Sequence, residues 1–157
     1  MFGTLSPDDT EILLQQQLVG RIGCHARDVT YVVPISYAYD GTYIYGHTSE
    51  GMKIDMMRKN PKICFQADDT RDLSNWQSVI VWGEFEELSH GPERSQALQK
   101  LTERKLPLIS SETMHLTSQW PFQDEDVSKI SGVVFRIRVT EKTGRFEKST
   151  EKHFFAS

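Results

Sequence analysis

The feature that most constrains the fold is the dipeptide Asp40-Gly41, which separates the apolar runs "VTYVVPISYAY" and "TYIYGH". Asp-Gly between two β-prone runs is a strong signal for a tight hairpin turn. Strands joined this closely pair antiparallel, because a parallel pair needs a long crossover connection. Pro34 interrupts the first run, and proline donates no ladder hydrogen bond. We therefore expect Pro34 at a sheet edge, at a bulge, or where something other than a strand approaches the backbone.

Further strands and short helices follow from the rest of the sequence. Ser6-Pro7-Asp8-Asp9 predicts a capped helix that continues to about Gln17. A second helix of about two turns is expected from Met52 until Asn60-Pro61 ends it. The segments "LVGRIGCHA", "KICFQAD" and "SVIVWGEFEEL" predict strands, the last with a bulge or bend at Gly83.

The C-terminal half is expected to be less regular. "DTRDLSNW" indicates a polar loop, "ERSQALQKLTERK" a helix with Leu98 and Leu101 inward, and "LISSETMHLTSQWPFQDEDVSKI" a short helix and a loop. "GVVFRIRVTEKTGRFEKS" predicts a strand, a turn at Thr143-Gly144 and a final strand or tail. Hairpins with short intervening helices favour a mainly β (α+β) antiparallel barrel with peripheral helices, in one domain spanning residues 1–157.

Length, charge and cysteine usage exclude several classes of protein. A chain of 157 residues fits one domain, and a net charge of −4 disfavours a nucleic-acid binder. No apolar run approaches the roughly 20 residues of a membrane span. The N-terminus lacks the pattern of a secretory signal, so a cytoplasmic location is expected. Cys24 and Cys64 lie in apolar runs without CxxC spacing, which predicts reduced core thiols and no metal site.

Residues 47–53, called the elbow below, join a predicted strand to a predicted helix. His47, Thr48 and Lys53 lie there, and Gly51 allows close approach to the backbone. Hydroxyls, exposed amides and a cation at a helix start suit an anion. The alternative is that Ser49 only caps the helix, with Glu50 in its first turn and Lys53 in water.

Two more segments extend this interpretation. If the hairpin pairs "VVPIS" with the strand that ends at His47, both segments share a surface. Trp76, Gln77 and Ser78 begin a later strand with groups able to stack on, or hydrogen-bond to, a flat heterocycle. The three segments together predict a site for a phosphorylated aromatic molecule.

The ordered series "VGRIGCHARDVTYVVPISYAYDGTYIYGHTSEGMKIDMMRKNPKICFQAD" and "SVIVWGEFEEL" resembles the pyridoxamine 5′-phosphate oxidase-like superfamily of FMN-binding split barrels. Within it, the sequence is most similar to the branch of the nitroimidazole-resistance proteins, with their "VP" strand, "YxH[ST]xxGxK" elbow and helix ending in "NP". The resemblance covers roughly residues 18–88, with weaker support from "FRIRVTEKTGR".

This resemblance implies a six-stranded antiparallel split β-barrel that forms a homodimer and binds FMN at the subunit interface. The oxidase itself commonly has an Arg-Lys pair at the elbow, where this chain has Met52 before Lys53, so pyridoxamine phosphate oxidation is not implied. The implied phosphate ligands are Lys53 with His47 and Thr48, and Met52 of the elbow is a further implied cofactor-binding residue. The implied ring contacts are Val33, Pro34, Ile35, Ser36, Ser78 and Val79.

Two functions are therefore expected as alternatives. One is a flavin-dependent oxidoreductase acting on a small organic, possibly nitroaromatic, acceptor, with NADH or NADPH docking transiently because no GxGxxG fingerprint is present. The other is a non-catalytic flavin- or heme-binding module that serves as a carrier, sensor or sequestering protein. His47 is the candidate proton donor. The remaining histidines are interpreted as surface residues: His25, His90, His115 and His153.

Overall fold

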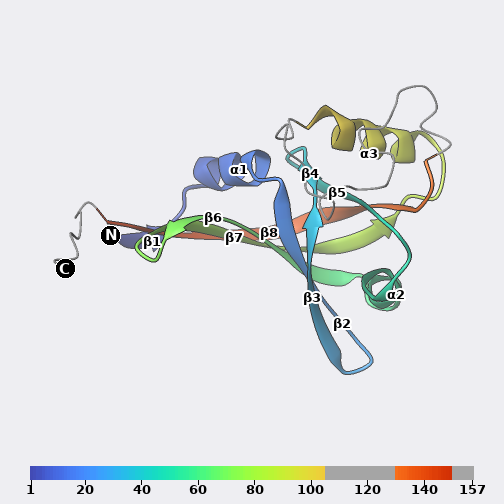
Figure 1. Cartoon of the computed structure of the whole chain (residues 1–157), viewed down its shortest axis with the longest axis horizontal. Helices are drawn as coiled ribbons and strands as arrows, with labels where there is room; N and C mark the ends of the chain where they lie inside the picture. Colours follow the sequence, from blue (N-terminus) through green and yellow to red (C-terminus); the bar gives the residue numbers. More distant parts are fainter. Residues whose placement is uncertain (105–129, 150–157) are drawn as a thin grey trace, which may run out of the picture.

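The computed structural model describes residues 1–104 and 130–149, and a single antiparallel sheet dominates this part of the chain (Figure 1). Its elements are β1 (Phe2–Thr4), α1 (Pro7–Gln16), β2 (Val19–Ala26), β3 (Val29–Ser36), β4 (Ala38–Tyr39), β5 (Tyr43–Thr48), α2 (Met52–Lys59), β6 (Lys62–Asp72), β7 (Asn75–Glu87), α3 (Pro92–Glu103) and β8 (Val133–Lys148). The strand order is β3-β2-β6-β7-β8-β5-β4, and β1 pairs with β8. The predicted mainly β fold with peripheral helices is confirmed.

The sheet wraps around a core supplied by alternate residues of its strands. Ile22, Phe65 and Ile137 are completely buried in it, and α2 adds Ile54 and Met57. A second, smaller cluster lies between α3 and the strands β4, β5 and β8, where Leu98 and Leu101 of α3 are completely buried, as predicted. Figure 1 shows α1 and α3 on one side of the long strands, with α2 beside the lower part of the β2–β3 hairpin.

Local sequence signals account for several element boundaries. The Ser6 Oγ accepts a hydrogen bond from the Asp9 N–H at 3.1 Å, so Ser6 caps α1 as predicted. α2 ends at Asn60, immediately before Pro61. The pairing of β7 with β8 changes register between Trp82 and Gly83, which confirms the predicted bulge.

The pairing predicted for the first hairpin is wrong. β3 pairs with β2 along its whole length, and only the two residues of β4 pair with β5. Tyr37 lies between β3 and β4, and its buried hydroxyl donates to the Leu14 carbonyl at 2.7 Å. The turn itself is where Asp40-Gly41 predicted it, with the Asp40 carboxylate accepting from the Thr42 and Tyr43 amides. β3 is the terminal strand of the sheet, so the edge position expected for Pro34 is confirmed.

Two predicted irregular regions are regular. The polar loop expected at "DTRDLSNW" is wrong, because β6 and β7 continue to a two-residue turn at Leu73-Ser74. The turn expected at Thr143-Gly144 is also wrong, because β8 runs through it. A Cβ at Gly144 would lie 2.8 Å from Leu5 Cβ, so glycine is needed there for close packing instead of a turn. The predictions for "LISSETMHLTSQWPFQDEDVSKI", His115 and His153 fall mainly or wholly outside the described residues.

The two cysteines differ in their environment. Cys24 is buried in the core, as predicted, whereas Cys64 is only partly buried on the opposite face of the sheet, which corrects the prediction for that residue. Neither forms a disulfide. In the described part of the chain, no helix combines the length and apolar character needed to cross a membrane.

Candidate functional site

The elbow joins β5 to α2 without a side-chain cap. Gly51 is the N-cap residue of α2, and among the residues that the structure describes no side chain caps the first turn. Ser49 therefore does not cap the helix, and that alternative interpretation is wrong. The first amide groups of a helix have no partner within the helix, so the amides at the start of α2 are available to an anion. The first backbone bond of the helix runs from the Asp55 N–H to the Gly51 carbonyl.

Lys53 lies in the first turn of α2 and is half-buried. Within the described residues, its ammonium group makes no hydrogen bond or ion pair. Burial lowers the pKa of Lys53, and the nearby Cys24 thiol of β2 partly opposes this shift. A half-buried cation next to open helix amides is an environment that an anionic group would stabilise.

His47 faces away from the main core and is almost fully buried, with 6% of its surface exposed. Its Nε2 lies 2.6 Å from the Ser131 carbonyl oxygen, and because a carbonyl only accepts, Nε2 carries the hydrogen. Gly132 has φ +98°, and a Cβ there would lie 2.9 Å from both His47 Nε2 and the Thr48 oxygen. Within the described residues, His47 thus holds the chain before β8 against the elbow strand and presents little surface to solvent.

The predicted ring contacts divide between the two sides of β3. Pro34 is exposed and Ser36 partly exposed on the outer face of the sheet, whereas Val33 and Ile35 pack against the core. Since β3 is the terminal strand, the backbone along its free edge pairs with no described strand. A planar ligand at this edge would meet the side chains of Pro34 and Ser36 and the backbone of their neighbours.

The outer face carries a hydrogen-bonded cluster that links β2, β6 and β7. Arg21 lies opposite Pro34 in the β2–β3 ladder, and its guanidinium donates to Asp68 at 2.8 Å and to Gln66 at 3.2 Å. The Gln66 amide in turn donates to the Ser78 hydroxyl at 3.0 Å. Pro34 and Ser78, predicted from separate segments, therefore belong to one surface with Arg21 between them.

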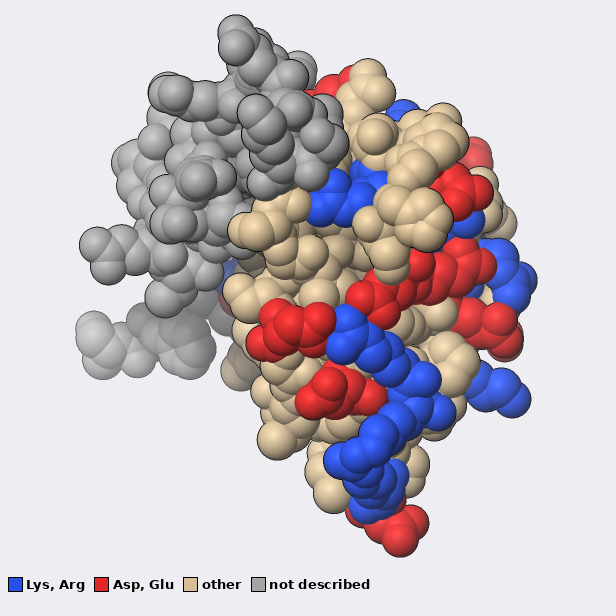
Figure 2. All heavy atoms as spheres, turned by 90° about the vertical axis from the view of Figure 1, so that its right-hand side faces the viewer, with Lys and Arg blue, Asp and Glu red and all other residues tan. Residues whose placement is uncertain are grey.

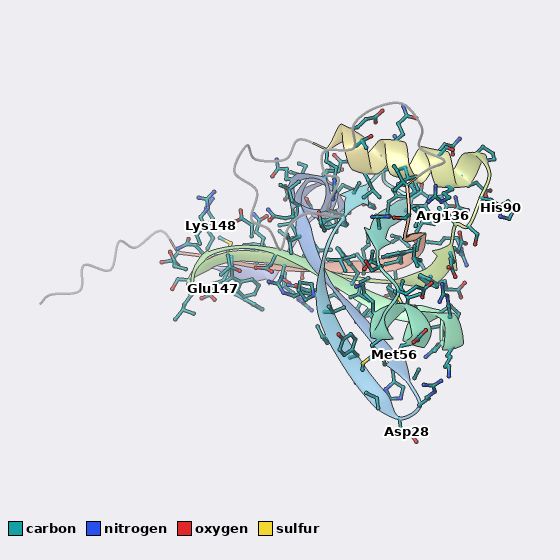
Figure 3. The ribbon with its side chains drawn as sticks, turned by 45° about the vertical axis from the view of Figure 1, so that its right-hand side comes forward. Asp28, Met56, His90, Arg136, Glu147 and Lys148 are labelled. Carbon is teal, nitrogen blue, oxygen red and sulfur yellow. The ribbon has the colours of Figure 1, made fainter. Side chains whose placement is uncertain are left out.

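A groove of about 450 Å³ lies on this outer face, beside the paired residues Arg21 and Pro34. Its size falls within the usual range of small-molecule sites, about 300–1,000 Å³. Lys53 interacts electrostatically with Cys24. Cys24 belongs to the segment of β2 from Gly23 to His25 that lines the groove. Figure 3 shows α2 beside the β2–β3 hairpin, whose tip carries Asp28. The groove is lined chiefly by Gly23, Val32, Cys64, Trp82, Glu84 and Thr140.

The other predicted site residues lie in different environments. Met52 is 58% exposed at the start of α2, and Thr48 is partly buried at the end of β5. Val79 is completely buried in the core, so its side chain cannot contact a ligand on the surface of this chain. Ser78 is partly buried on the outer face.

Sequence reasoning missed two arginines of this region. Arg104, after α3, donates to the Ser36 hydroxyl at 2.6 Å and to the Tyr37 carbonyl at 2.9 Å. Burial lowers the pKa of Arg104 to about 10. Arg104 lies 68 residues from Ser36 in the chain, so no local sequence pattern predicts their contact. Arg21 did have a signal, because a single cation within the alternating run "VGRIG" indicates an outward position on a strand.

Residues 6–146 match the sequence profile of the pyridoxamine 5′-phosphate oxidase family. The chain belongs to this family. The match covers the elbow, the β3 edge and the outer face together, which agrees with the resemblance drawn from the sequence.

The fold of this chain is similar to that of several solved structures. An FAD-binding protein from Mesorhizobium loti is 28% identical, with a TM-score of 0.72 over 94% of this chain and 99% of that one. A protein from Bacteroides thetaiotaomicron, provisionally described as a 5-nitroimidazole antibiotic resistance protein, is 19% identical, with a TM-score of 0.67 over 93% of this chain and 87% of that one. At that identity the second likeness concerns the fold alone.

Among proteins compared by sequence, an uncharacterised protein of Rhizobium meliloti (strain 1021) is 40% identical over 70 residues. This alignment spans 45% of the chain and 46% of the relative, so it covers less than half of either protein.

Proposed function

We propose that this member of the pyridoxamine 5′-phosphate oxidase family binds a flavin, with the flavin 5′-phosphate at the elbow. The observation that carries the proposal is Lys53, a half-buried cation that has no ion-pair partner among the described residues and adjoins the uncapped start of α2. Helix amides and a cation together favour a phosphate. The FAD-binding relative from Mesorhizobium loti supports a flavin as the ligand.

FMN is the proposed flavin, and FAD shares the same 5′-phosphate. The flavin released from the purified protein by heat, separated by chromatography, identifies which of the two is bound. A visible absorption spectrum of the same sample distinguishes flavin from heme. A protein that carries heme and no flavin, or that binds neither added FMN nor added FAD, would refute this assignment.

The phosphate position is tested with Lys53→Ala and Lys53→Arg. Loss of one charge-assisted hydrogen bond should weaken FMN binding by about 1.5–3 kcal/mol, which is roughly ten- to hundredfold. Arginine keeps the positive charge and should retain most of the affinity. Riboflavin lacks the phosphate, so its affinity should change little in either variant. An unchanged FMN dissociation constant in Lys53→Ala would remove Lys53 from the site.

The flavin ring is proposed to lie along the free edge of β3, above Pro34 and Ser36 and close to the Arg21 cluster. The chemistry supplied there by a bound flavin is the transfer of a hydride or electrons. The groups of this chain would bind and orient the ring. Arg104 donates to the Ser36 Oγ, so the hydrogen of that hydroxyl is free to point elsewhere and Ser36 can donate to a ring acceptor.

A homodimer is proposed to cover the outer face. Val32 of β3 is 65% exposed, and Ile80 and Trp82 of β7 are each 40% exposed. Gly23 of β2 and Cys64 of β6 lie between Val32 and Trp82 in the same ladder row of this face. A contiguous exposed apolar surface of this kind usually marks an interface. Trp82→Lys would place a charge there and should convert the dimer to monomers, which light scattering at micromolar concentration measures. A wild-type mass equal to one chain would contradict the dimer.

The proposed activity is that of a flavin-dependent oxidoreductase with a small organic acceptor, such as a nitroaromatic compound. The test is whether NADH or NADPH reduces the bound flavin, and whether an acceptor then reoxidises it faster than it reoxidises free FMN. A protein that retains flavin stoichiometrically but passes electrons to no acceptor faster than free FMN does would be a binding module. The family's name and the exposed edge of β3 favour the enzyme.

A further inference from the structure

Arg58, in the last turn of α2, joins the elbow to the end of β7. Its Nη1 and Nη2 atoms each donate to a carboxylate oxygen of Glu50 at 2.8 Å. Its Nε and Nη2 atoms donate to Glu87 at 2.8 and 2.6 Å. Both contacts are paired hydrogen bonds of the kind that guanidinium and carboxylate groups form most strongly. The side of the molecule that carries α2 shows acidic and basic side chains in contact along a diagonal band (Figure 2).

Glu50 is the residue directly before Gly51, the N-cap of α2. A carboxylate at this position is attracted by the positive end of the helix, where the proposed flavin phosphate would bind. In the structure the Glu50 carboxylate instead points along the helix flank toward Arg58, eight residues later. The hydrogen bonds from Arg58 lower the pKa of Glu50, because they favour its charged form.

Glu87 completes the arrangement from a different element. It lies at the exposed end of β7, where 31% of its side-chain surface is exposed, and its two hydrogen bonds hold the guanidinium against the sheet. Asp55 of α2 also lies 4.0 Å from Arg58 Nη1. Three carboxylates thus surround one arginine close to a site that needs to accept an anion. Removal of the arginine would leave their charges unbalanced beside that site.

We propose that Arg58 is a positioning residue that keeps the Glu50 carboxylate away from the start of α2 and thereby leaves the elbow open to a phosphate. The inference rests on the proposed function, because it concerns the same phosphate position. Arg58 acts through Glu50 and need not contact the ligand. The physical requirement is simple: an anion binds the helix amides only if the chain's own carboxylate does not compete for them.

The test is a double-mutant cycle on FMN affinity, measured by the change of flavin fluorescence on binding. Arg58→Gln should raise the FMN dissociation constant by about three- to tenfold. The reason is that the released Glu50 carboxylate would compete with the phosphate for the amides of α2 and would also repel it. In Arg58→Gln/Glu50→Gln the affinity should return to within about twofold of Glu50→Gln alone. Arg71→Gln is the matched control for charge, because Arg71 lies in the exposed distal part of β6, and it should leave the affinity unchanged.

Riboflavin provides the readout that a merely structural role would not give. It has no phosphate, so Arg58→Gln should bind it as wild type does. Recovery in the double variant together with unchanged riboflavin binding supports the proposal. Wild-type FMN affinity in Arg58→Gln would overturn it, as would a loss that persists in the double variant or affects riboflavin equally. If the wild-type protein does not bind FMN more tightly than riboflavin, the proposed phosphate site itself is refuted. This result separates failure of the phosphate site from failure of the role proposed for Arg58.

Discussion

Replacing Lys53 by methionine should stabilise the flavin-free protein. Methionine keeps an unbranched apolar stem of similar length and removes the ammonium group. In the structure that group is half-buried, and burial lowers the pKa of Lys53, so the charged form is destabilised in the folded state. Because the side chain is partly exposed and screened by water, we expect a gain of no more than about 1 kcal/mol in the free energy of unfolding. For a chain of this size, that corresponds to about 2–4 °C in melting temperature.

The same substitution should weaken FMN binding. Loss of a charge-assisted hydrogen bond to the phosphate costs about 1.5–3 kcal/mol, or roughly ten- to hundredfold in the dissociation constant. FMN at one hundred times its dissociation constant raises wild-type stability by about 2.7 kcal/mol. With that concentration of FMN present, the variant should therefore melt below wild type, although it melts above wild type without FMN.

The pH dependence follows from the direction of the pKa shift. The folded-state pKa of Lys53 lies below its ordinary value of 10.5, so the unfolded chain holds this proton to higher pH than the folded protein does. Stability of the flavin-free wild type then rises as pH passes from the folded-state pKa toward 10.5, and the advantage of Lys53→Met should shrink over that interval.

Thermal unfolding followed by circular dichroism, at neutral and at alkaline pH and with and without FMN, measures all three expectations. Lys53→Arg serves as the control, because it retains the charge and should show no gain in the flavin-free protein. A flavin-free Lys53→Met protein that melts below wild type at neutral pH would refute the reasoning, since the ammonium would then be stabilising without a ligand.

Two further substitutions test the elbow strand. Gly46→Ala would place a Cβ 2.4 Å from the Cζ of Phe135, so urea unfolding should show a loss of about 1–3 kcal/mol, and wild-type stability would contradict the packing described. His47→Gln should lower the stability by about 1–3 kcal/mol and loosen the flavin, because it disturbs the contact with Ser131. Turnover per bound flavin should then be unchanged, whereas a rate that falls most above pH 7 with flavin still bound would identify His47 as a proton donor.

Much of the fold could be predicted because its signals are local. Ser6 needs only the amide of Asp9 to begin α1, and Pro61 is incompatible with continuation of α2 whatever surrounds it. Pro34 cannot donate to a ladder, so its position at an edge follows from its own chemistry. The elbow could likewise be predicted from the sequence, because a strand end, a glycine and a lysine at a helix start lie within seven residues.

Strand partners were not predictable in the same way. β3 pairs with β2 and not with β5, and Tyr37, directly after β3, donates through its buried hydroxyl to Leu14 of α1. Gly144 resembles a turn residue in sequence, yet it is required by the close approach of Leu5 to β8. Both errors arise because the competing interaction comes from residues distant in the chain, which no local pattern records.

For the candidate site, the sequence by itself determined which residue could attract an anion, because the charge of Lys53 and its place at a helix start are properties of one short segment. Only the tertiary structure decided which charges surround that segment. Arg58 meets Glu87 across 29 residues, and Arg21 meets Asp68 across 47. Such pairs exist because the fold brings α2 beside the end of β7 and places β2 beside β6, and the sign and strength of the local field depend on that packing.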